Sequence, residues 1–442
     1  MKQNRTLRKK DSQRKISRRS IIGGAAGVAA GYFVGNTVSA LESRSALEKL
    51  NVAVIGLGGQ GGANLNGVKN ENVVALCDVD DVRAGKAYER FSKAKKFYDF
   101  RELFDKIGKE IDAAVISTPD HTHFHIAHRA LSEGKHVYLE KPMAHNVWEC
   151  RELTNLAKEK KLATQLGVQR HTIPNMHRVV ELIKSGAIGK VQEVHCWIDS
   201  NRGMTPQNKK LNKVPASLKY DLWLGPAKRR MGYDPKVTPY GWRFFWDYGT
   251  GETGNWGCHV LDIPFWALDL KYPTKVGGSG DLANPISTPK KMDSWMEFPA
   301  NGDRPPVKLH WSQAKGGPQI LKDKGLSAKG NNTLFIGEDG MLLCGFSQRK
   351  LLPEEKFADF EPPKQSIPKS PGFHREFINF CKGGEPATCN FDYSGPMAET
   401  VLLGNVAYRS LATFDWDAKN LKSSSGIAQR FIKESYAKGW EV

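Results

Sequence analysis

Residues 52–61, with the sequence VAVIGLGGQG, decide the fold of this chain. Four apolar residues typical of a short buried strand lead directly into a turn with glycine at its first, third and sixth positions, and a helix-compatible stretch follows. A second apolar run, residues 73–77, ends at Asp78, 22 residues beyond Gly56. The order of strand, glycine turn, helix, strand and acid is that of a dinucleotide-binding βαβ unit.

Each part of this unit has a physical role toward a dinucleotide. The first glycine permits the tight turn, the second lets the backbone approach the pyrophosphate, and the third lets helix and strand pack closely. The acid accepts hydrogen bonds from the adenosine ribose hydroxyls, and its charge repels the extra phosphate of NADP. We therefore predict NAD as the cofactor, with NADP disfavoured. The expected contacts from this unit are Gly56, Leu57, Gly58, Gln60, Gly61 and Asp78.

The pattern of short apolar runs continues along the first third of the chain. Residues 113–116, 136–139 and 163–166 are further buried-type strands, separated by stretches long enough for helices. Alternation of strands and helices favours a doubly wound parallel sheet. We predict an α/β dinucleotide-binding domain over residues 50–170.

The signal changes beyond residue 170, where we predict an α+β substrate and oligomerisation domain over residues 171–442. Residues 200–255 are dense in Gly, Pro, Trp and Tyr, a composition expected of a segment that wraps a substrate site or an oligomer contact. The remaining predicted elements are helices at 176–185, 374–381 and 397–412 and strands at 191–198, 307–311 and 333–336.

The first forty residues have the character of a secretory leader. Residues 1–20 carry nine Lys or Arg and one Asp, including the pair Arg18-Arg19, and residues 21–40 carry no charge and end in the small-residue sequence VSA. This pattern is typical of a twin-arginine signal peptide. We predict export to the periplasm by the twin-arginine translocation machinery. The alternative is that an uncleaved leader holds the protein on the membrane, although its apolar run is shorter than the roughly 20 residues that a spanning helix needs.

Composition excludes several other classes of protein. With 40% hydrophobic and 25% charged residues, the chain is not predominantly disordered or collagen-like. The net charge of +18 comes partly from the leader, and no basic motif interleaved with aromatics is present, so we expect no nucleic-acid partner. The seven cysteines include no C-x-x-C pair and are expected to be dispersed core thiols, with a bridge between Cys381 and Cys389 left open.

Two polar motifs follow predicted strands of the parallel sheet. Residues 117–123 (STPDHTH) come directly after one strand and residues 140–142 (EKP) after the next, at the carboxyl ends where such sheets bind ligands. Together with the glycine turn and a later segment, residues 257–259 (GCH), these motifs resemble those of the Gfo/Idh/MocA family of oxidoreductases. The resemblance covers nearly the whole chain from Asn51.

The resemblance implies a Rossmann domain followed by an open-sheet α/β domain, with the substrate between that sheet and the nicotinamide. Lys141 would contact cofactor and substrate and stabilise the alkoxide, and His259 would be the general acid/base. A homo-oligomer, either dimer or tetramer, is also implied. Further cofactor contacts would come from Thr118, Pro119, His123, Glu140, Lys141 and Gln169.

One position departs from the family pattern. Members commonly carry Asp four residues before the histidine, where this chain has Asn255, which can hydrogen-bond a substrate but carries no charge. Asp262 either orients the site or stabilises the structure nearby. The four histidines at positions 121, 123, 125 and 128 include no complete ligand set, so no metal is predicted. Candidate residues for stacking on sugar faces are Trp223, Trp242, Trp246 and Trp256.

Export constrains the chemistry. The periplasm is expected to hold no useful pool of free NAD, so the cofactor must be retained and returned to its starting oxidation state in each cycle. We expect an exported oxidoreductase that acts on a hydroxyl of a small carbohydrate or cyclitol. The alternatives are a redox-neutral glycosidase or lyase, in which the substrate takes its hydride back after an elimination, and a non-catalytic sugar-binding protein on the same fold.

Overall fold

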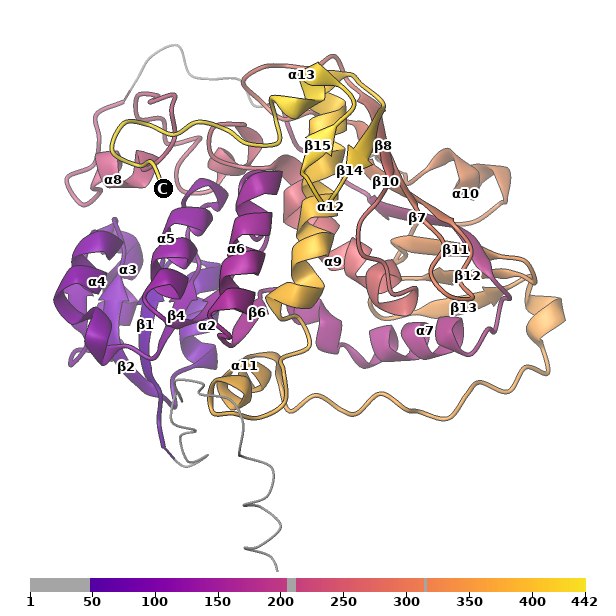
Figure 1. The fold of residues 1–442 in the computed structure, drawn as a ribbon, viewed down its shortest axis with the longest axis horizontal. Coiled ribbons are helices and arrows are strands. Elements are labelled where there is room, and N and C mark those ends of the chain that lie inside the picture. The colour runs from indigo at the N-terminus through magenta and orange to yellow at the C-terminus, as the bar shows by residue number, and fades with distance from the viewer. Residues whose placement is uncertain (1–47, 205–211, 314–315) are drawn as a thin grey trace, which may run out of the picture. The chain divides into compact units, whose positions relative to one another are not determined.

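The computed structural model describes residues 48–204, 212–313 and 316–442. Its first sheet has six parallel strands in the order β3-β2-β1-β4-β5-β6 (Figure 1). The chain leaves β1 toward β2 on one side, and β4 lies on the other side, so the carboxyl ends of β1 and β4 form the switch point where doubly wound sheets bind ligands. The strands are β1 (Asn51–Ile55), β2 (Asn72–Cys77), β3 (Lys95–Phe97), β4 (Ala113–Ile116), β5 (His136–Leu139) and β6 (Thr164–Leu166).

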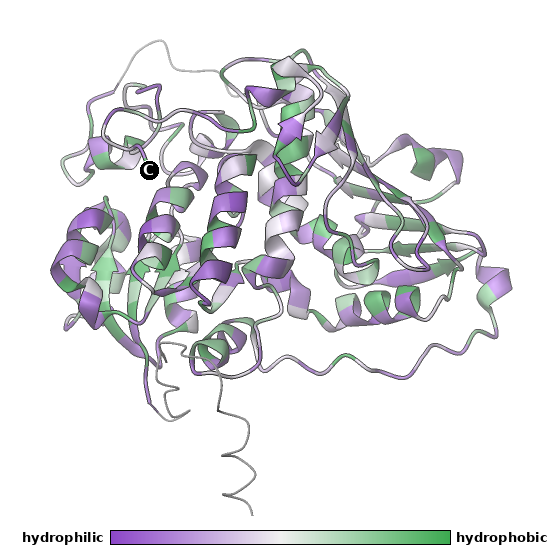
Figure 2. Cartoon of the chain, viewed as in Figure 1, coloured by the Kyte–Doolittle hydropathy of each residue, from purple (hydrophilic) through white to green (hydrophobic). Residues whose placement is uncertain are grey.

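The helices of this domain begin at side chains suited to capping. Asp80 caps one helix, Asp99 caps the next, and Asn146 forms a capping box with Glu149. Figure 2 shows green strands between helices with purple faces, the pattern of an apolar sheet covered by amphipathic helices. The helices are α2 (Gln60–Gly67), α3 (Asp81–Arg90), α4 (Phe100–Ile107), α5 (Asp120–Ser132) and α6 (Val147–Glu159), with the 3-10 turn η1 (Gly108–Glu110).

The second sheet has nine strands in the order β13-β12-β11-β7-β10-β9-β8-β14-β15. Only the pair β7 and β10 is parallel among the described pairs of this sheet. Thus both predicted sheets, and the fold class, are confirmed. The strands are β7 (Val191–Ile198), β8 (Lys275–Gly280), β9 (Met292–Phe298), β10 (Val307–Gln313), β11 (Thr333–Gly337), β12 (Met341–Cys344), β13 (Arg349–Leu352), β14 (Phe414–Asp417) and β15 (Lys422–Ser423).

Helices pack between and beside the two sheets. The long helix α9 (Gly251–Ala267) contacts β7, and α12 (Phe391–Ser410) contacts β8, β9 and helix α6 of the first domain. The remaining helical elements are α7 (Pro174–Lys184), α8 (Tyr220–Leu224), α10 (Gln319–Asp323), α11 (Phe373–Cys381), α13 (Gly426–Gln429) and the 3-10 turns η2 (Gln169–Thr172), η3 (Gly241–Phe244) and η4 (Glu354–Phe357).

C-terminal segments return to the N-terminal domain. Helix α11 packs on it through Phe377, whose ring lies 5.8 Å from that of Tyr138 in β5. After α13 the chain crosses α6, where the Trp148 N–H donates to the Ile432 carbonyl at 2.9 Å, and ends beside α5, where the Trp440 carbonyl lies 2.9 Å from His125 Nε2 (Figure 1). Residues 426–442 are called the C-terminal strap below.

Two further predictions from the sequence concern the leader and a possible disulfide bridge. The predicted leader, residues 1–40, lies outside the described residues. Among the helices in the described ranges, none combines the length and apolarity needed to cross a bilayer.

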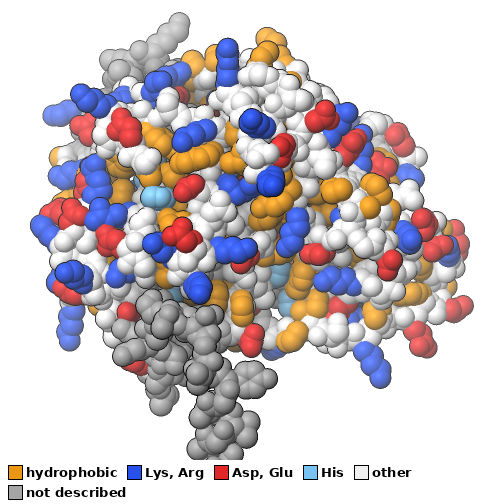
Figure 3. Space-filling model, viewed as in Figure 1, with side chains coloured by type: hydrophobic (Ala, Val, Ile, Leu, Met, Phe, Trp, Pro, Cys, Tyr) orange, Lys and Arg blue, Asp and Glu red, His pale blue; other side chains and the backbone are white. Residues whose placement is uncertain are grey.

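Cys381 and Cys389 are free thiols, so the bridge left open by the sequence is absent. On the face drawn in Figure 3, basic and acidic side chains are interspersed.

The two domains are joined by a buried ion pair. Arg151 of α6 donates from Nε and Nη2 to the two carboxylate oxygens of Glu399 in α12, both at 2.7 Å, and the Glu399 side chain is fully buried. Burial raises the pKa of Glu399 to about 7, although Arg151 opposes the rise. The carboxylate therefore depends on its arginine.

Arg151→Ala should lower the free energy of unfolding by about 3 kcal/mol at pH 8, because it leaves a buried carboxylate without a cation. Lowering the pH protonates that carboxyl in the folded state, so the deficit should shrink by pH 5. Urea denaturation at both pH values measures this. The control, Lys95→Ala, breaks the exposed pair with Glu110 and should cost less than about 1 kcal/mol. An equal deficit at both pH values would contradict this account.

Candidate active site at the junction of the two sheets

One elongated cavity of about 720 Å³ runs from the glycine turn to the second sheet's domain. This volume lies in the range of about 300–1,000 Å³ typical of small-molecule sites. The first end is lined by the glycine turn, Asp78 and Tyr98. The second end is lined by side chains from η2, η3 and α9, among them His259. The cavity therefore joins the predicted cofactor site to the predicted substrate site.

The glycine turn has the geometry that a pyrophosphate needs. Gly56 has φ of 83°, and a Cβ there would lie 2.6 Å from the Ser117 carbonyl oxygen, so only glycine fits. A Cβ on Gly61 would lie 2.0 Å from the carbonyl oxygen of Gly56, which shows how closely α2 approaches β1. Helix α2 begins at the turn, so the positive end of its dipole faces the turn. These residues fit a dinucleotide.

Asp78 stabilises the same turn. Its Oδ2 accepts from the Leu57 N–H at 2.7 Å and its Oδ1 accepts from the Asp80 N–H at 3.0 Å, which leaves lone pairs on both oxygens for ribose hydroxyls. Burial raises the pKa of Asp78, while the two backbone hydrogen bonds and Arg83 oppose the rise. Arg83 also lines the cavity, and its guanidinium lies where a Cβ on Gly58 would point.

At the other end, Lys141 crosses from the first domain to the second. It follows β5, and its Nζ donates to the backbone oxygen of Asn255 at 2.9 Å and to its Oδ1 at 3.1 Å. The Asn255 amide nitrogen donates to Glu252 Oε2 at 2.8 Å, and Arg202 and Ser200 donate to the other oxygen of Glu252. Asn255 is thus fixed with its oxygen toward the lysine. Two of the three ammonium protons are used, and one remains for a ligand.

The electrostatics of this end keep His259 neutral. His259 lies on α9 one turn after Asn255 and lines the cavity with Lys141. Burial, and then the charges of Lys141 and Arg170, hold the pKa of His259 well below its usual range. Burial lowers the pKa of Lys141 too, and Arg243 adds to this effect while Glu140 and Asp120 oppose it. A neutral imidazole next to an ammonium can accept a proton and stabilise a developing oxyanion.

Most of the predicted site residues meet at this cavity. Those that line it are Gly56, Gly58, Gln60, Asp78, Thr118, Pro119, Glu140, Lys141, Gln169, Asn255 and His259, together with Trp223, Trp242 and Trp256. Leu57, Gly61, His123 and Trp246 lie outside the lining set. His123 is buried, and its ring nitrogens lie 2.7 Å from the Pro142 oxygen and 2.8 Å from the Thr118 oxygen, so it joins the two loops behind the cavity wall.

Several lining residues were not predicted from the sequence. They are Arg83, Tyr98, Arg202, Tyr240, Arg243 and Trp440. The Gly- and aromatic-rich composition of residues 200–255 was the available signal for three of them, since it indicated a site-wrapping segment without naming its functional residues. Trp440 had no such signal, because only the path of the strap brings it to the cavity.

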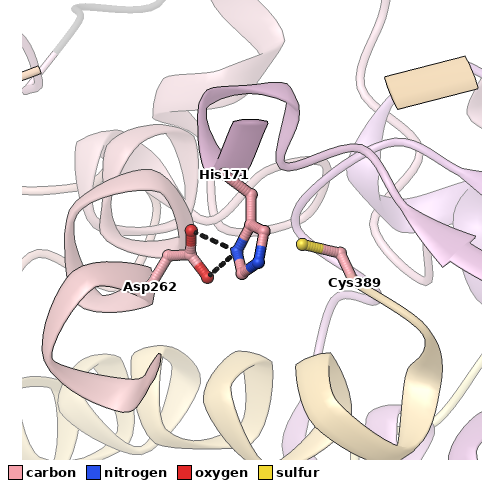
Figure 4. A group of neighbouring side chains, drawn as sticks. All are labelled: His171, Asp262 and Cys389. Carbon is pink, nitrogen blue, oxygen red and sulfur yellow. Dashed lines mark hydrogen bonds and ion pairs between the residues drawn. The ribbon is translucent and has the colours of Figure 1, made fainter. Parts of the chain in front are cut away.

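A second polar group lies beside the cavity, where His171 of η2 lies between Asp262 of α9 and Cys389 (Figure 4). His171 Nδ1 is 2.9 Å from Asp262 Oδ2, and the Tyr393 hydroxyl donates to Asp262 Oδ1 at 2.6 Å. Burial raises the pKa of the Cys389 thiol well above its usual range, so the thiol stays protonated. The Asp262 carboxylate therefore binds His171 and Tyr393 and stabilises the domain junction. Of the two roles that the sequence left open, these contacts favour stabilisation of the structure nearby.

Two family models match consecutive stretches of this chain. One, described as "Oxidoreductase family, NAD-binding Rossmann fold", matches residues 50–168. The other, described as "Oxidoreductase family, C-terminal alpha/beta domain", matches residues 175–277, and both are models of one family. The chain belongs to the Gfo/Idh/MocA family. Its first domain is accordingly an NAD-binding Rossmann domain.

Individual curated relatives match about a third of this chain. The inositol 2-dehydrogenase of Salmonella typhimurium is 29% identical over 152 residues, which are 33% of this chain and 45% of that protein. A glycosyl hydrolase family 109 protein of Solibacter usitatus is 30% identical over 162 residues, 32% of this chain and 35% of that protein. The chain thus spans less than half the length of these curated relatives.

Solved structures resemble both domains. The WlbA dehydrogenase of Chromobacterium violaceum, in complex with NADH and UDP-GlcNAcA, superimposes with a TM-score of 0.61 over 85% of this chain and 98% of its own. Its sequence is 15% identical, so the likeness concerns the fold alone.

The placement of Asp78 predicts the cofactor preference. Asp78→Asn keeps an acceptor for the Leu57 N–H but removes the negative charge, leaving Arg83 to attract a 2′-phosphate. Relief of about 1.4 kcal/mol of repulsion would shift the ratio of NAD to NADP affinity about tenfold toward NADP. Titration of both cofactors by calorimetry into apoprotein measures it. Asp105→Asn, on the exposed face of α4, is the control, and an unchanged ratio in Asp78→Asn would refute the assignment.

Proposed function

We propose that this protein is an exported oxidoreductase that uses tightly held NAD to oxidise a hydroxyl of a carbohydrate or cyclitol. The observation that carries the proposal is the meeting of Lys141 and His259 at one end of a cavity whose other end is the glycine turn. Its substrate class is supported by the inositol dehydrogenases among the relatives. The leader sequence supports export and the twin-arginine route. The open-sheet second domain supports homo-oligomerisation.

The site residues divide the chemistry between them. When bound, NAD supplies an acceptor for the hydride of the carbinol carbon. His259, neutral at pH 7, takes the hydroxyl proton as the carbonyl forms. The third N–H of Lys141 stabilises the negative charge that develops on the oxygen. Asn255 positions the ammonium group without neutralising it.

The C-terminal strap supports retention of the cofactor. Trp440 lines the cavity, its ring lies 6.0 Å from that of Phe100, and the guanidinium of Arg101 lies 4.5 Å from it. Tyr436 donates to Glu149 at 2.9 Å, and the Ala437 N–H donates to the Pro226 oxygen at 2.9 Å. The strap is therefore held at several points along its path, and a dinucleotide leaving this end of the cavity would have to displace it.

The test is to denature the purified protein and assay the supernatant for NAD and NADH. We expect about one nicotinamide per chain, and an absorbance change of the bound nicotinamide when the right sugar is added. Trp440→Ala should lose the nicotinamide during gel filtration, whereas Trp295→Ala, on the second sheet outside the cavity, should keep it. Protein that is folded but empty would contradict retention. Sugar binding without any absorbance change would favour the non-catalytic alternative.

The pH dependence of sugar oxidation should follow the two shifted groups. Activity requires neutral His259 and charged Lys141, so the acid limb of kcat/KM should lie below about pH 6.5 and the alkaline limb below about pH 10.4, the ordinary values. Asn255→Asp adds a negative charge and should move both limbs upward by about one unit. Steady-state pH profiles of kcat/KM measure this. The control is Asn72→Asp, at the exposed first residue of β2. Limbs that fail to move would contradict the assigned roles.

A redox-neutral glycosidase or lyase is the second candidate, favoured by the glycosyl hydrolase family 109 relative. In that reaction the substrate would take back its hydride after elimination, so a retained cofactor would need no outside acceptor. Chromogenic glycosides incubated without added NAD distinguish the two. Release of the aglycone, lost in Lys141→Met, would show that net dehydrogenation is not the whole reaction.

A further inference from the structure

Two arginines at the substrate end of the cavity have no acidic partner among the residues that the structure describes. Arg170 lies with its guanidinium 5.2 Å from the ring of Trp256 and 4.3 Å from that of Phe346. Arg243 lies 4.4 Å from the ring of Trp242 and 5.0 Å from that of Tyr240. Within residues 48–204, 212–313 and 316–442, neither guanidinium forms an ion pair or a side-chain hydrogen bond, although both line the cavity.

The third arginine of this end shows the contrast. Arg202 also lines the cavity, but its Nε donates to the buried carboxylate of Glu252. That carboxylate is shared with Ser200 and Asn255, so it is fully used. Arg202 therefore belongs to the network that fixes the site.

The other carboxylates at this end are also engaged. Glu140 Oε1 accepts from Gln169 at 2.6 Å and from Asn64 at 3.0 Å. Asp120 Oδ2 accepts from the Thr250 hydroxyl at 2.7 Å and from its N–H at 3.1 Å. Neither is within ion-pair distance of Arg170 or Arg243.

The neighbourhood of the reacting groups is consequently cationic. The charge of Arg170 reaches His259 and helps to lower its pKa, and that of Arg243 reaches Lys141 with the same effect. Burial also lowers the pKa of Arg170 itself. Two partly desolvated guanidinium groups beside an ammonium are unfavourable without counter-charge, and a bound anion would supply it.

The pyrophosphate of the cofactor does not account for these arginines. Its predicted position is the glycine turn and the start of α2, at the other end of the cavity. Stacking on aromatic rings holds each guanidinium plane while leaving the edge N–H groups free. That edge matches carboxylate, phosphate or sulfate oxygens.

We propose that the substrate is an anionic carbohydrate, whose acidic group is bound by Arg170 and Arg243 while Lys141 and His259 act on a hydroxyl of the same molecule. This inference rests on the proposed function, because it takes the same cavity as the substrate site. The shared chemistry is an anionic sugar substituent, and three sources can supply it: a sugar carboxylate, a phosphate ester or a sulfate ester.

The test uses the NAD-loaded protein and measures binding separately from reaction. D-Glucuronate, D-glucose 6-phosphate, D-glucose 6-sulfate and D-glucose are titrated by calorimetry at constant ionic strength, and the nicotinamide absorbance is followed in parallel. At least one anionic sugar should bind about tenfold or more tightly than glucose, in keeping with charge-assisted hydrogen bonds. The best binder identifies the acidic group.

Arg170→Gln and Arg243→Gln supply the decisive comparison. Each should weaken binding of the anionic sugar about tenfold or more, leave glucose binding within about threefold, and keep the nicotinamide content. The control is Arg90→Gln, on α3 outside the cavity, which should change nothing. The inference is overturned if the variants weaken both kinds of sugar equally, if they lose nicotinamide instead, or if no anion in the panel binds in an arginine-dependent manner.

The outcomes keep the two proposals distinct. Arginine-dependent binding of an anionic sugar without any absorbance change would support the anion site and contradict the oxidoreductase. Oxidation of sugars in the panel, with no anionic sugar bound in an arginine-dependent manner, would support the oxidoreductase and contradict the anion site.

Discussion

The contact on which the site depends is the pair of hydrogen bonds from Lys141 to Asn255. Lys141 follows strand β5 at the carboxyl end of the parallel sheet, whereas Asn255 belongs to helix α9, which also carries His259. These bonds hold the ammonium and the imidazole at one end of a shared cavity. Glu252, clamped by Arg202 and Ser200, fixes the amide so that its oxygen, and not its nitrogen, faces the lysine.

Asparagine at this position also sets the charge of the site. An aspartate would neutralise Lys141. The neutral amide of Asn255 does not compensate the positive charge of Lys141, Arg170 and Arg243. Burial, and then the charges of Lys141 and Arg170, keep His259 neutral, and the same excess of positive charge is the basis of the proposed anionic ligand. Asparagine in place of the family's aspartate, and two arginines without acidic partners among the described residues, therefore have the same effect: both leave the site positively charged.

The parts that sequence could predict are those encoded locally. The glycine turn and Asp78 follow from a spacing of 22 residues, and the strands that carry STPDHTH and EKP are continuous apolar runs. Strand β3, with the sequence KKF, has no such run and was not predicted. The resemblance put His123 at the cofactor, but its two ring nitrogens face backbone oxygens. Motif spacing shows which turn holds a residue and not which way its ring points.

The rest depends on long-range packing. Arg243 reaches the cavity from a segment without hydrophobic periodicity, and Trp440 reaches it from a strap some 300 residues beyond the helix it touches. For Arg243 the sequence indicated only a segment that wraps a site, and for Trp440 it gave no local signal.

The strap has a consequence for the order of events in synthesis. Because Trp440 lies far beyond the six strands of the parallel sheet in the chain, this wall of the dinucleotide cleft is synthesised long after the sheet itself. Helices α11 and α12, which cover the edge of the parallel sheet, also emerge late. The parallel sheet can therefore form while the cleft is still open, and a cofactor is enclosed only when the strap docks. Docking of the strap would then mark the end of the period in which a cofactor can enter the open cleft.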